Sequence, residues 1–122
     1  MNQAAVERVA FVGLGVMGYT MAGHLAAKGY RVTVFNRTQA KADQWVTEHG
    51  GSSAATPAGA ARDAQAVFAC VGNDDDIRAV TMGQDGAFHG MSKGAVFIDH
   101  TTASAEIARE LYDEAKSRGL EF

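Results

Sequence analysis

The stretch VAFVGLGVMG, residues 9–18, decides the fold of this chain. Its first four residues are apolar, which is the length and composition of a buried strand. The glycines Gly13, Gly15 and Gly18 follow in the pattern G-x-G-x-x-G, and apolar residues with helical spacing come after them. A glycine pattern placed between a strand and a helix is typical of a dinucleotide-binding turn.

Each glycine of this pattern has a physical role in such a turn. Gly13 allows the tight turn, Gly15 lets a pyrophosphate approach the backbone, and Gly18 lets the helix pack close to the strand. The pyrophosphate then lies on free N–H groups at the positive end of the helix. A glycine-rich turn that binds nothing is the alternative, but the strand and helix around the motif favour a binding site. The predicted cofactor-binding residues of this segment are Gly13, Leu14, Gly15, Val16, Met17 and Gly18.

Apolar runs of strand length alternate with longer segments of helical period along the rest of the chain. This alternation is typical of a parallel sheet with helices on its faces. We therefore predict an α/β fold of the Rossmann type, a doubly wound and mainly parallel sheet with helices on both faces, as one domain over residues 1–122. The predicted strands are residues 9–12, 31–35, 66–71 and 95–98, and the predicted helices are residues 17–28, 40–49, 56–62, 75–82 and 104–117.

Residue types predict where several helices begin and which face of the first helix is apolar. Thr38, Thr56 and Ser104 stand where an N-cap hydroxyl is favoured, and Pro57 occupies the first position of its helix. Residues 120–122 begin a further apolar, strand-like segment, so the domain is expected to be truncated there. The predicted apolar face of the first helix holds Met17, Met21, Ala22 and Leu25.

Composition argues against several classes of protein. The net charge is −3 without a basic block, so a nucleic-acid partner is not expected. The single cysteine, Cys70, has no partner for an intrachain disulfide, and the histidines lack the spacing of zinc ligands. No apolar run approaches the length of a membrane span. We therefore expect a cytoplasmic protein without a metal and without a membrane partner.

The segment VFNRT, residues 34–38, bears on the choice of cofactor. A site selective for NAD usually places an acidic residue about 20 residues after the glycine turn, whereas this chain has Asn36 and Arg37 there. Arg37 can contact a ribose 2′-phosphate or stack on adenine, and Asn36 and Thr38 can add neutral hydrogen bonds. The alternative is that Arg37 is a solvated charge at a strand end. We predict NADP(H) as the cofactor, with NAD(H) possible, and Asn36, Arg37 and Thr38 as cofactor-binding residues.

A third candidate segment, ACVGNDDD, occupies residues 69–76 at the end of a predicted strand. Because that end faces the cofactor crevice in such folds, Val71, Gly72 and Asn73 are predicted to contact the cofactor. The three consecutive aspartates, residues 74–76, suggest either a metal cluster or a helix start. We favour the helix start, since carboxylates stabilise its amides and no other metal ligands converge on them in the sequence.

A fourth segment, IDHTTAS, residues 98–104, gathers polar groups at the end of the last predicted strand. A nucleophilic triad is disfavoured because neighbouring strand residues point to opposite faces. Ser104 is also a ready N-cap for the following helix, so a structural role for part of the segment stays open.

These segments together resemble the N-terminal domain of the β-hydroxyacid dehydrogenase family, which includes 3-hydroxyisobutyrate dehydrogenase, 6-phosphogluconate dehydrogenase and the imine reductases. The resemblance is carried by GLGVMGYTMA, NRT and DHTT in this order, over residues 9–122. It implies that Thr102 contacts the nicotinamide end of the cofactor and that Thr101 lies near the substrate. Many members have Leu-Pro where this chain has Val71 and Gly72, so the rigidity of that loop differs.

The resemblance also implies an activity for the full-length protein. It would transfer a hydride between NADP(H) and a small 3-hydroxyacid or its semialdehyde, as a homo-oligomer. Members of the family carry their catalytic lysine and a helical domain beyond the region matched here, so we assign no catalytic residue and expect this chain alone to bind cofactor without turnover. An imine reductase of the same family and a non-catalytic dinucleotide-binding module are the alternatives.

Overall fold

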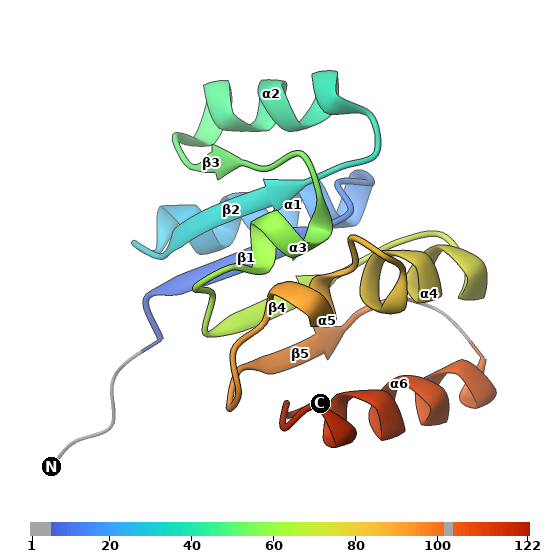
Figure 1. Cartoon of the computed structure of the whole chain (residues 1–122). Coiled ribbons are helices and arrows are strands. Elements are labelled where there is room, and N and C mark those ends of the chain that lie inside the picture. The colour runs from blue at the N-terminus through green and yellow to red at the C-terminus, as the bar shows by residue number, and fades with distance from the viewer. Residues whose placement is uncertain (1–5, 102–103) are drawn as a thin grey trace, which may run out of the picture.

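A computed structural model describes residues 6–101 and 104–122 and contains a parallel sheet covered by helices (Figure 1). Five strands lie in the order β3-β2-β1-β4-β5, and every pairing between neighbours is parallel. The strands are β1 (Arg8–Val12), β2 (Arg31–Phe35), β3 (Ser52–Ser53), β4 (Ala66–Ala69) and β5 (Val96–Asp99). The helices are α1 (Val16–Ala27), α2 (Gln39–His49), α3 (Pro57–Ala61), α4 (Asp74–Met82), α5 (Ala87–Gly90) and α6 (Ala105–Ser117).

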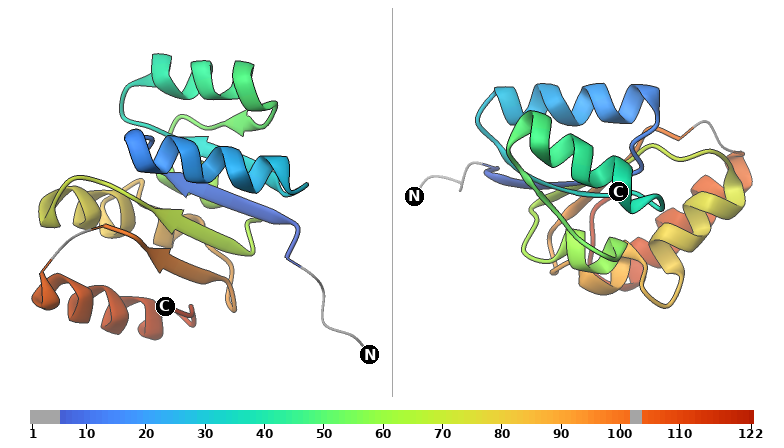
Figure 2. Two further views of the ribbon diagram at one scale, coloured as in Figure 1. Left: turned by 180° about the vertical axis from the view of Figure 1, so that it is seen from behind. Right: turned by 90° about the horizontal axis from the view of Figure 1, so that it is seen from above.

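The central strand β1 shows why the sheet is covered on both faces. Successive strand residues point to opposite faces. Val9 and Phe11 pack with residues of α1 and α2, whereas Ala10 and Val12 pack with residues of α3, α4, α5 and α6. The two further views show these helices on opposite sides of the sheet (Figure 2). The predicted doubly wound α/β fold is therefore confirmed.

The connections produce a change of direction beside β1. The chain runs outward from β1 through β2 to β3 and then crosses back to add β4 and β5 on the other side (Figure 1). Ligands of open α/β sheets bind at this switch point, outside the carboxyl ends of the strands. In this molecule those ends are Val12, Phe35 and Ala69.

The predicted elements are all present, and two short ones were missed. β3 is only two serines long and pairs with Thr33 and Val34, and α5 has four residues, follows Gly86 and ends at Gly90. Neither has enough apolar periodicity to be recognised from sequence. The predicted strand-like character of residues 120–122 is supported by a parallel bridge between Glu121 and Val96, in which Glu121 O accepts from Phe97 N at 2.9 Å.

Candidate functional site

A cavity of about 810 Å³ opens at the carboxyl ends of β1, β2 and β4. Its size is within the usual range for small-molecule and cofactor sites. Most of the residues predicted to bind cofactor line it: Gly13, Leu14, Gly15, Val16, Met17, Asn36, Arg37, Thr38, Val71 and Gly72. The structure thus brings three separate sequence segments together around one cavity.

The glycine turn is held to the end of β2 by two consecutive N–H groups. Gly13 N donates to Phe35 O at 2.9 Å, and Leu14 N donates to Asn36 Oδ1 at 2.9 Å. Gly13 has φ +96°, in the region that favours glycine, and a Cβ there would lie 2.3 Å from Cys70 O. The turn is therefore specified by its own backbone and by Asn36.

The other two glycines of the motif differ in what surrounds them. A Cβ on Gly18 would lie 2.3 Å from Gly13 O, so α1 packs directly on the turn. A Cβ on Gly15 would meet nothing within 4 Å, although the residue lines the cavity. The space beside Gly15 is open, as the close approach of a ligand to the backbone requires.

The first turn of α1 faces the cavity and is not capped by a side chain. The first N–H groups of a helix have no partner within it, so they remain available to a ligand. The side chains of Val16 and Met17 are 87% and 64% exposed. Met17 was predicted on the apolar face of this helix together with Ala22, but Ala22 is buried in the core whereas Met17 is exposed and lines the cavity.

The end of β2 supplies Asn36, Arg37 and Thr38. Asn36 Nδ2 donates to Thr38 O at 3.1 Å, while its Oδ1 is used by Leu14. Asn36 therefore orders the loop, with both ends of its amide engaged. Thr38 precedes α2 as its N-cap, but its side chain makes no cap hydrogen bond. Arg37 is largely exposed, and its Nη2 lies 3.4 Å from Asp76 Oδ1.

The loop from β4 to α4 presents backbone at Val71 and Gly72, which both line the cavity. Asn73 does not line it. Asn73 Oδ1 instead accepts a hydrogen bond from Asp76 N at 2.9 Å and caps α4. The three aspartates form the first turn of α4, so the predicted helix start is confirmed, but the side chain that caps the helix is that of Asn73.

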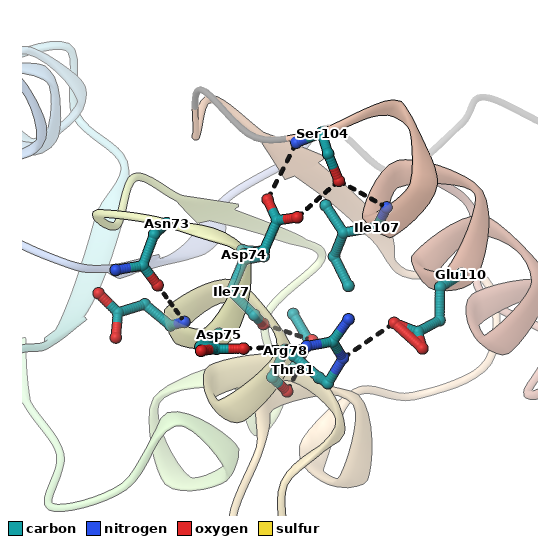
Figure 3. Close-up of polar contacts among 10 residues, drawn as sticks. Asn73, Asp74, Asp75, Ile77, Arg78, Thr81, Ser104, Ile107 and Glu110 are labelled. Atoms are coloured by element: carbon teal, nitrogen blue, oxygen red, sulfur yellow. Dashed lines mark hydrogen bonds and ion pairs between the residues drawn. The ribbon is translucent and has the colours of Figure 1, made fainter.

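A network of side chains joins the start of α4 to α6 (Figure 3). Asp74 Oδ1 accepts from Ser104 N at 2.9 Å, and Asp74 Oδ2 accepts from Ser104 Oγ at 2.6 Å. These bonds, led by the one from the hydroxyl, hold the pKa of the Asp74 carboxyl below its ordinary value. Ser104 Oγ in turn accepts from Ile107 N, which confirms Ser104 as the N-cap of α6. Arg78 Nε donates to Glu110 Oε1 at 2.9 Å and forms a second link between α4 and α6.

Two hydrogen bonds, to the loop that follows β4 and to the end of β5, hold Thr101 in position. Its Oγ1 accepts from Val71 N at 3.0 Å, and its own N–H donates to Asp99 Oδ1 at 2.7 Å. His100 stacks on Phe68 with ring centroids 6.1 Å apart. Thr101 thus braces the β4 loop beside the cavity without lining it. The predicted nicotinamide contact, Thr102, lies outside the described residues.

Several cavity residues were missed by the sequence analysis, among them Pro57, Asp76 and Asp85. Asp76, Ala79 and Val80 have the i, i+3, i+4 spacing of one helix face, so the predicted helix already contained a signal for them. This spacing alone does not show that the face meets the cavity, because the direction of the face depends on how α4 packs against its neighbours. Within the described ranges, no group of three or more potential metal ligands occurs and no helix is long and apolar enough to span a membrane.

Comparison with known proteins places this chain in a family. Residues 8–122 match the NAD-binding domain of 6-phosphogluconate dehydrogenase. The chain belongs to this family. The "Uncharacterized oxidoreductase" of Shewanella frigidimarina is 60% identical over 106 residues, which are 87% of this chain and 36% of that protein. The "Probable 3-hydroxyisobutyrate dehydrogenase-like 2, mitochondrial" of Arabidopsis thaliana is 38% identical over 111 residues, 91% of this chain and 37% of that protein.

Solved structures agree with this assignment of an NAD-binding domain. The 3-hydroxyisobutyrate dehydrogenase of Mycobacterium tuberculosis, solved with L-serine, has a TM-score of 0.85 at 26% identity and is matched over 96% of this chain and 39% of its own. The imine reductase of Myxococcus stipitatus, solved with NADP+, has a TM-score of 0.82 at 25% identity over 93% of this chain and 38% of its own. The chain thus spans little more than a third of the length of these relatives.

Proposed function

We propose that this NAD-binding domain holds NADP(H) for an oxidoreductase that transfers a hydride to or from a small 3-hydroxyacid or its semialdehyde. The observation that carries the proposal is the open, uncapped start of α1 beside Gly15, in the same cavity as Arg37. A dinucleotide needs donors for its pyrophosphate and a place for its adenosine, and the cavity offers both.

The pyrophosphate would lie on the N–H groups at the start of α1, against Gly15 and Val16. The positive end of the helix dipole favours an anion at this position. Gly13 N is already bonded to Phe35 O and Leu14 N to Asn36 Oδ1, so these two N–H groups fix the turn, and the donors at the start of the helix remain for the ligand. Gly18 acts indirectly, by letting α1 pack on the turn.

The adenosine would lie at the end of β2. Arg37 would contact the ribose 2′-phosphate or the adenine face. The hydroxyl of Thr38, which makes no cap hydrogen bond to α2, would add a hydrogen bond to the ligand. The apolar side chains of Ala79 and Val80 would form the facing wall of the cavity. No acidic residue follows β2 directly, which supports NADP(H) over NAD(H).

The nicotinamide end would lie toward β4 and β5. Val71 and Gly72 would contact it through their backbone, and Thr102 through its hydroxyl, as the family resemblance implies. Asn73 would act through its cap of α4, and Thr101 would lie near the substrate while it holds Val71 N. The cofactor supplies the hydride chemistry when bound, and this domain orients it.

The cofactor proposal is tested by measuring the dissociation constants of NADPH and NADH side by side for the wild type and Arg37→Ala. Loss of a charge-assisted phosphate contact should weaken NADPH about tenfold to a hundredfold and leave NADH nearly unchanged. Arg109→Ala, an exposed arginine of α6 that does not line the cavity, is the matched control and should change neither. Equal affinities that Arg37→Ala does not alter would contradict the preference for NADP(H).

The reaction is tested on the full-length protein that carries this domain. NADP+-dependent oxidation of 3-hydroxyisobutyrate and related 3-hydroxyacids is the expected activity, and the domain alone should bind cofactor without turnover. An imine reductase is the second candidate, supported by the similarity to the Myxococcus stipitatus structure. NADPH-dependent reduction of cyclic imines without activity on any hydroxyacid would favour that candidate.

A further inference from the structure

Arg37 faces the cavity already paired with a carboxylate. Its Nη2 lies 3.4 Å from Asp76 Oδ1, and both residues line the cavity although they come from different halves of the molecule. The side chain of Arg37 is 83% exposed, whereas that of Asp76 is 27% exposed. The carboxylate is thus the better fixed member of the pair.

The position of Asp76 is set by the start of α4. Its N–H donates to Asn73 Oδ1 at 2.9 Å, which fixes its backbone in the first turn of the helix. Its Oδ2 lies 3.0 Å from the place where a Cβ on Gly72 would stand, so the carboxylate covers that glycine. Asp76 therefore projects from α4 across the β4 loop toward the end of β2.

The charges around the cavity make this pair important for the choice of cofactor. Among the described residues that line the cavity, Arg37 is the only lysine or arginine, and Asp76 and Asp85 are both carboxylates. A phosphate that enters this end of the cavity meets a guanidinium that already has an anionic partner. Two anions that share one cation compete for it and repel each other.

We propose that Asp76 is a specificity-determining residue, whose carboxylate competes with the 2′-phosphate of NADP(H) for Arg37 and so reduces the preference for NADP(H) over NAD(H). This inference rests on the proposed NADP(H) site. The end of β2 has no acidic residue, and the carboxylate that pairs with Arg37 comes from α4 instead. The ribose of NAD(H) has an uncharged 2′-hydroxyl, so Asp76 does not repel it.

The test is the ratio of NADH to NADPH dissociation constants in the wild type and Asp76→Asn, at low ionic strength because exposed charges are screened by salt. Asparagine keeps the size of the side chain and removes its charge. The ratio should rise about threefold to thirtyfold through tighter binding of NADPH, with NADH changed by less than about twofold. An unchanged ratio would overturn the proposal.

Asp75→Asn is the matched control because it removes the same charge from the same helical turn. Asp75 is 94% exposed, pairs with Arg78 at 3.2 Å and does not line the cavity. It should leave the ratio unchanged. An equal rise in this control would mean that overall charge is responsible and would overturn the role of Asp76.

The Arg37→Ala background separates this inference from the function on which it rests. Asp76→Asn should raise NADPH affinity less there than in the wild type, since the competition needs the guanidinium. An undiminished rise would overturn the competition. If Arg37→Ala weakens NADPH and Asp76→Asn does nothing, only the role of Asp76 fails; if Arg37→Ala has no effect on either cofactor, the NADP(H) site itself fails.

Discussion

The two halves of the sheet hold the loops around the cavity in different ways. In the half built from β1 and β2, backbone groups fix the glycine turn, and α1 and α2 begin at the cavity without a side-chain cap. In the half built from β4 and β5, Asn73 caps α4, Ser104 caps α6, and Asp74 joins the two. The starts of α1 and α2 therefore give no N–H group to a capping side chain, whereas those of α4 and α6 each give one.

This difference indicates which half receives the anionic part of a ligand. A capped helix start already has one of its first N–H groups bonded to a side chain, whereas an uncapped start keeps all of them for a bound anion. The β1 and β2 half therefore suits the pyrophosphate and ribose. In the β4 and β5 half, Asp74 at the start of α4 binds Ser104 at the start of α6 (Figure 3). Thr101 separately holds the backbone of Val71.

The largest effect should come from Gly13→Ala, which disrupts the glycine turn in the half built from β1 and β2. A Cβ there would lie 2.3 Å from Cys70 O, and the residue has φ +96°. Backbone strain and the clash together should lower the free energy of unfolding by about 2–5 kcal/mol. Chemical denaturation followed by circular dichroism measures this. A stability equal to that of the wild type would show that the turn adapts, contrary to the geometry.

Gly15→Ala sharpens the comparison, since the same substitution two residues later should spare the fold. The space beside Gly15 is open and its φ of −66° suits alanine, so the free energy of unfolding should change by less than about 1 kcal/mol. The new methyl would occupy the place where the pyrophosphate approaches, and NADPH affinity should fall at least about tenfold. Isothermal titration calorimetry on the folded variant measures the loss. Binding like that of the wild type would place the pyrophosphate elsewhere.

Sequence reasoning predicted most of the residues that line the cavity in the half built from β1 and β2. The glycine motif and the residues after β2 are local patterns, and their consequences depend on a turn of a few residues. It was less complete for the other half. Asn73 was predicted to contact the cofactor, and its side chain caps α4. Asp76 was predicted only as part of a helix start, and its carboxylate also pairs with Arg37.

The reason for these misses is physical. Which face of α4 meets the cavity depends on how that helix packs against α5 and α6, through contacts between residues far apart in sequence. Asp74 and Ser104 are 30 residues apart, so no local pattern predicts their pairing. Local backbone rules predict a turn, whereas side-chain networks between elements require the three-dimensional arrangement.

The smallest predicted effect is a pH dependence of stability that arises from Asp74, in the half built from β4 and β5. Hydrogen bonds from Ser104 hold the pKa of Asp74 below its ordinary value of 3.8, so the folded state binds a proton less readily there than the unfolded state. The contribution of Asp74 is therefore complete above the unfolded pKa and is lost as the pH falls through the folded pKa. The stability difference between the wild type and Asp74→Asn should be constant above about pH 5 and shrink below pH 3.8.

Urea midpoints at a series of pH values measure this difference, and Ser104→Ala provides the matching background. Removal of the hydroxyl takes away the main cause of the pKa shift, so Asp74→Asn should have a smaller pH-dependent effect in Ser104→Ala than in the wild type. The same pH dependence in both backgrounds would mean that another group lowers the pKa of Asp74. In that case the hydroxyl of Ser104 would not be the group that stabilises the charged form of Asp74, contrary to the geometry.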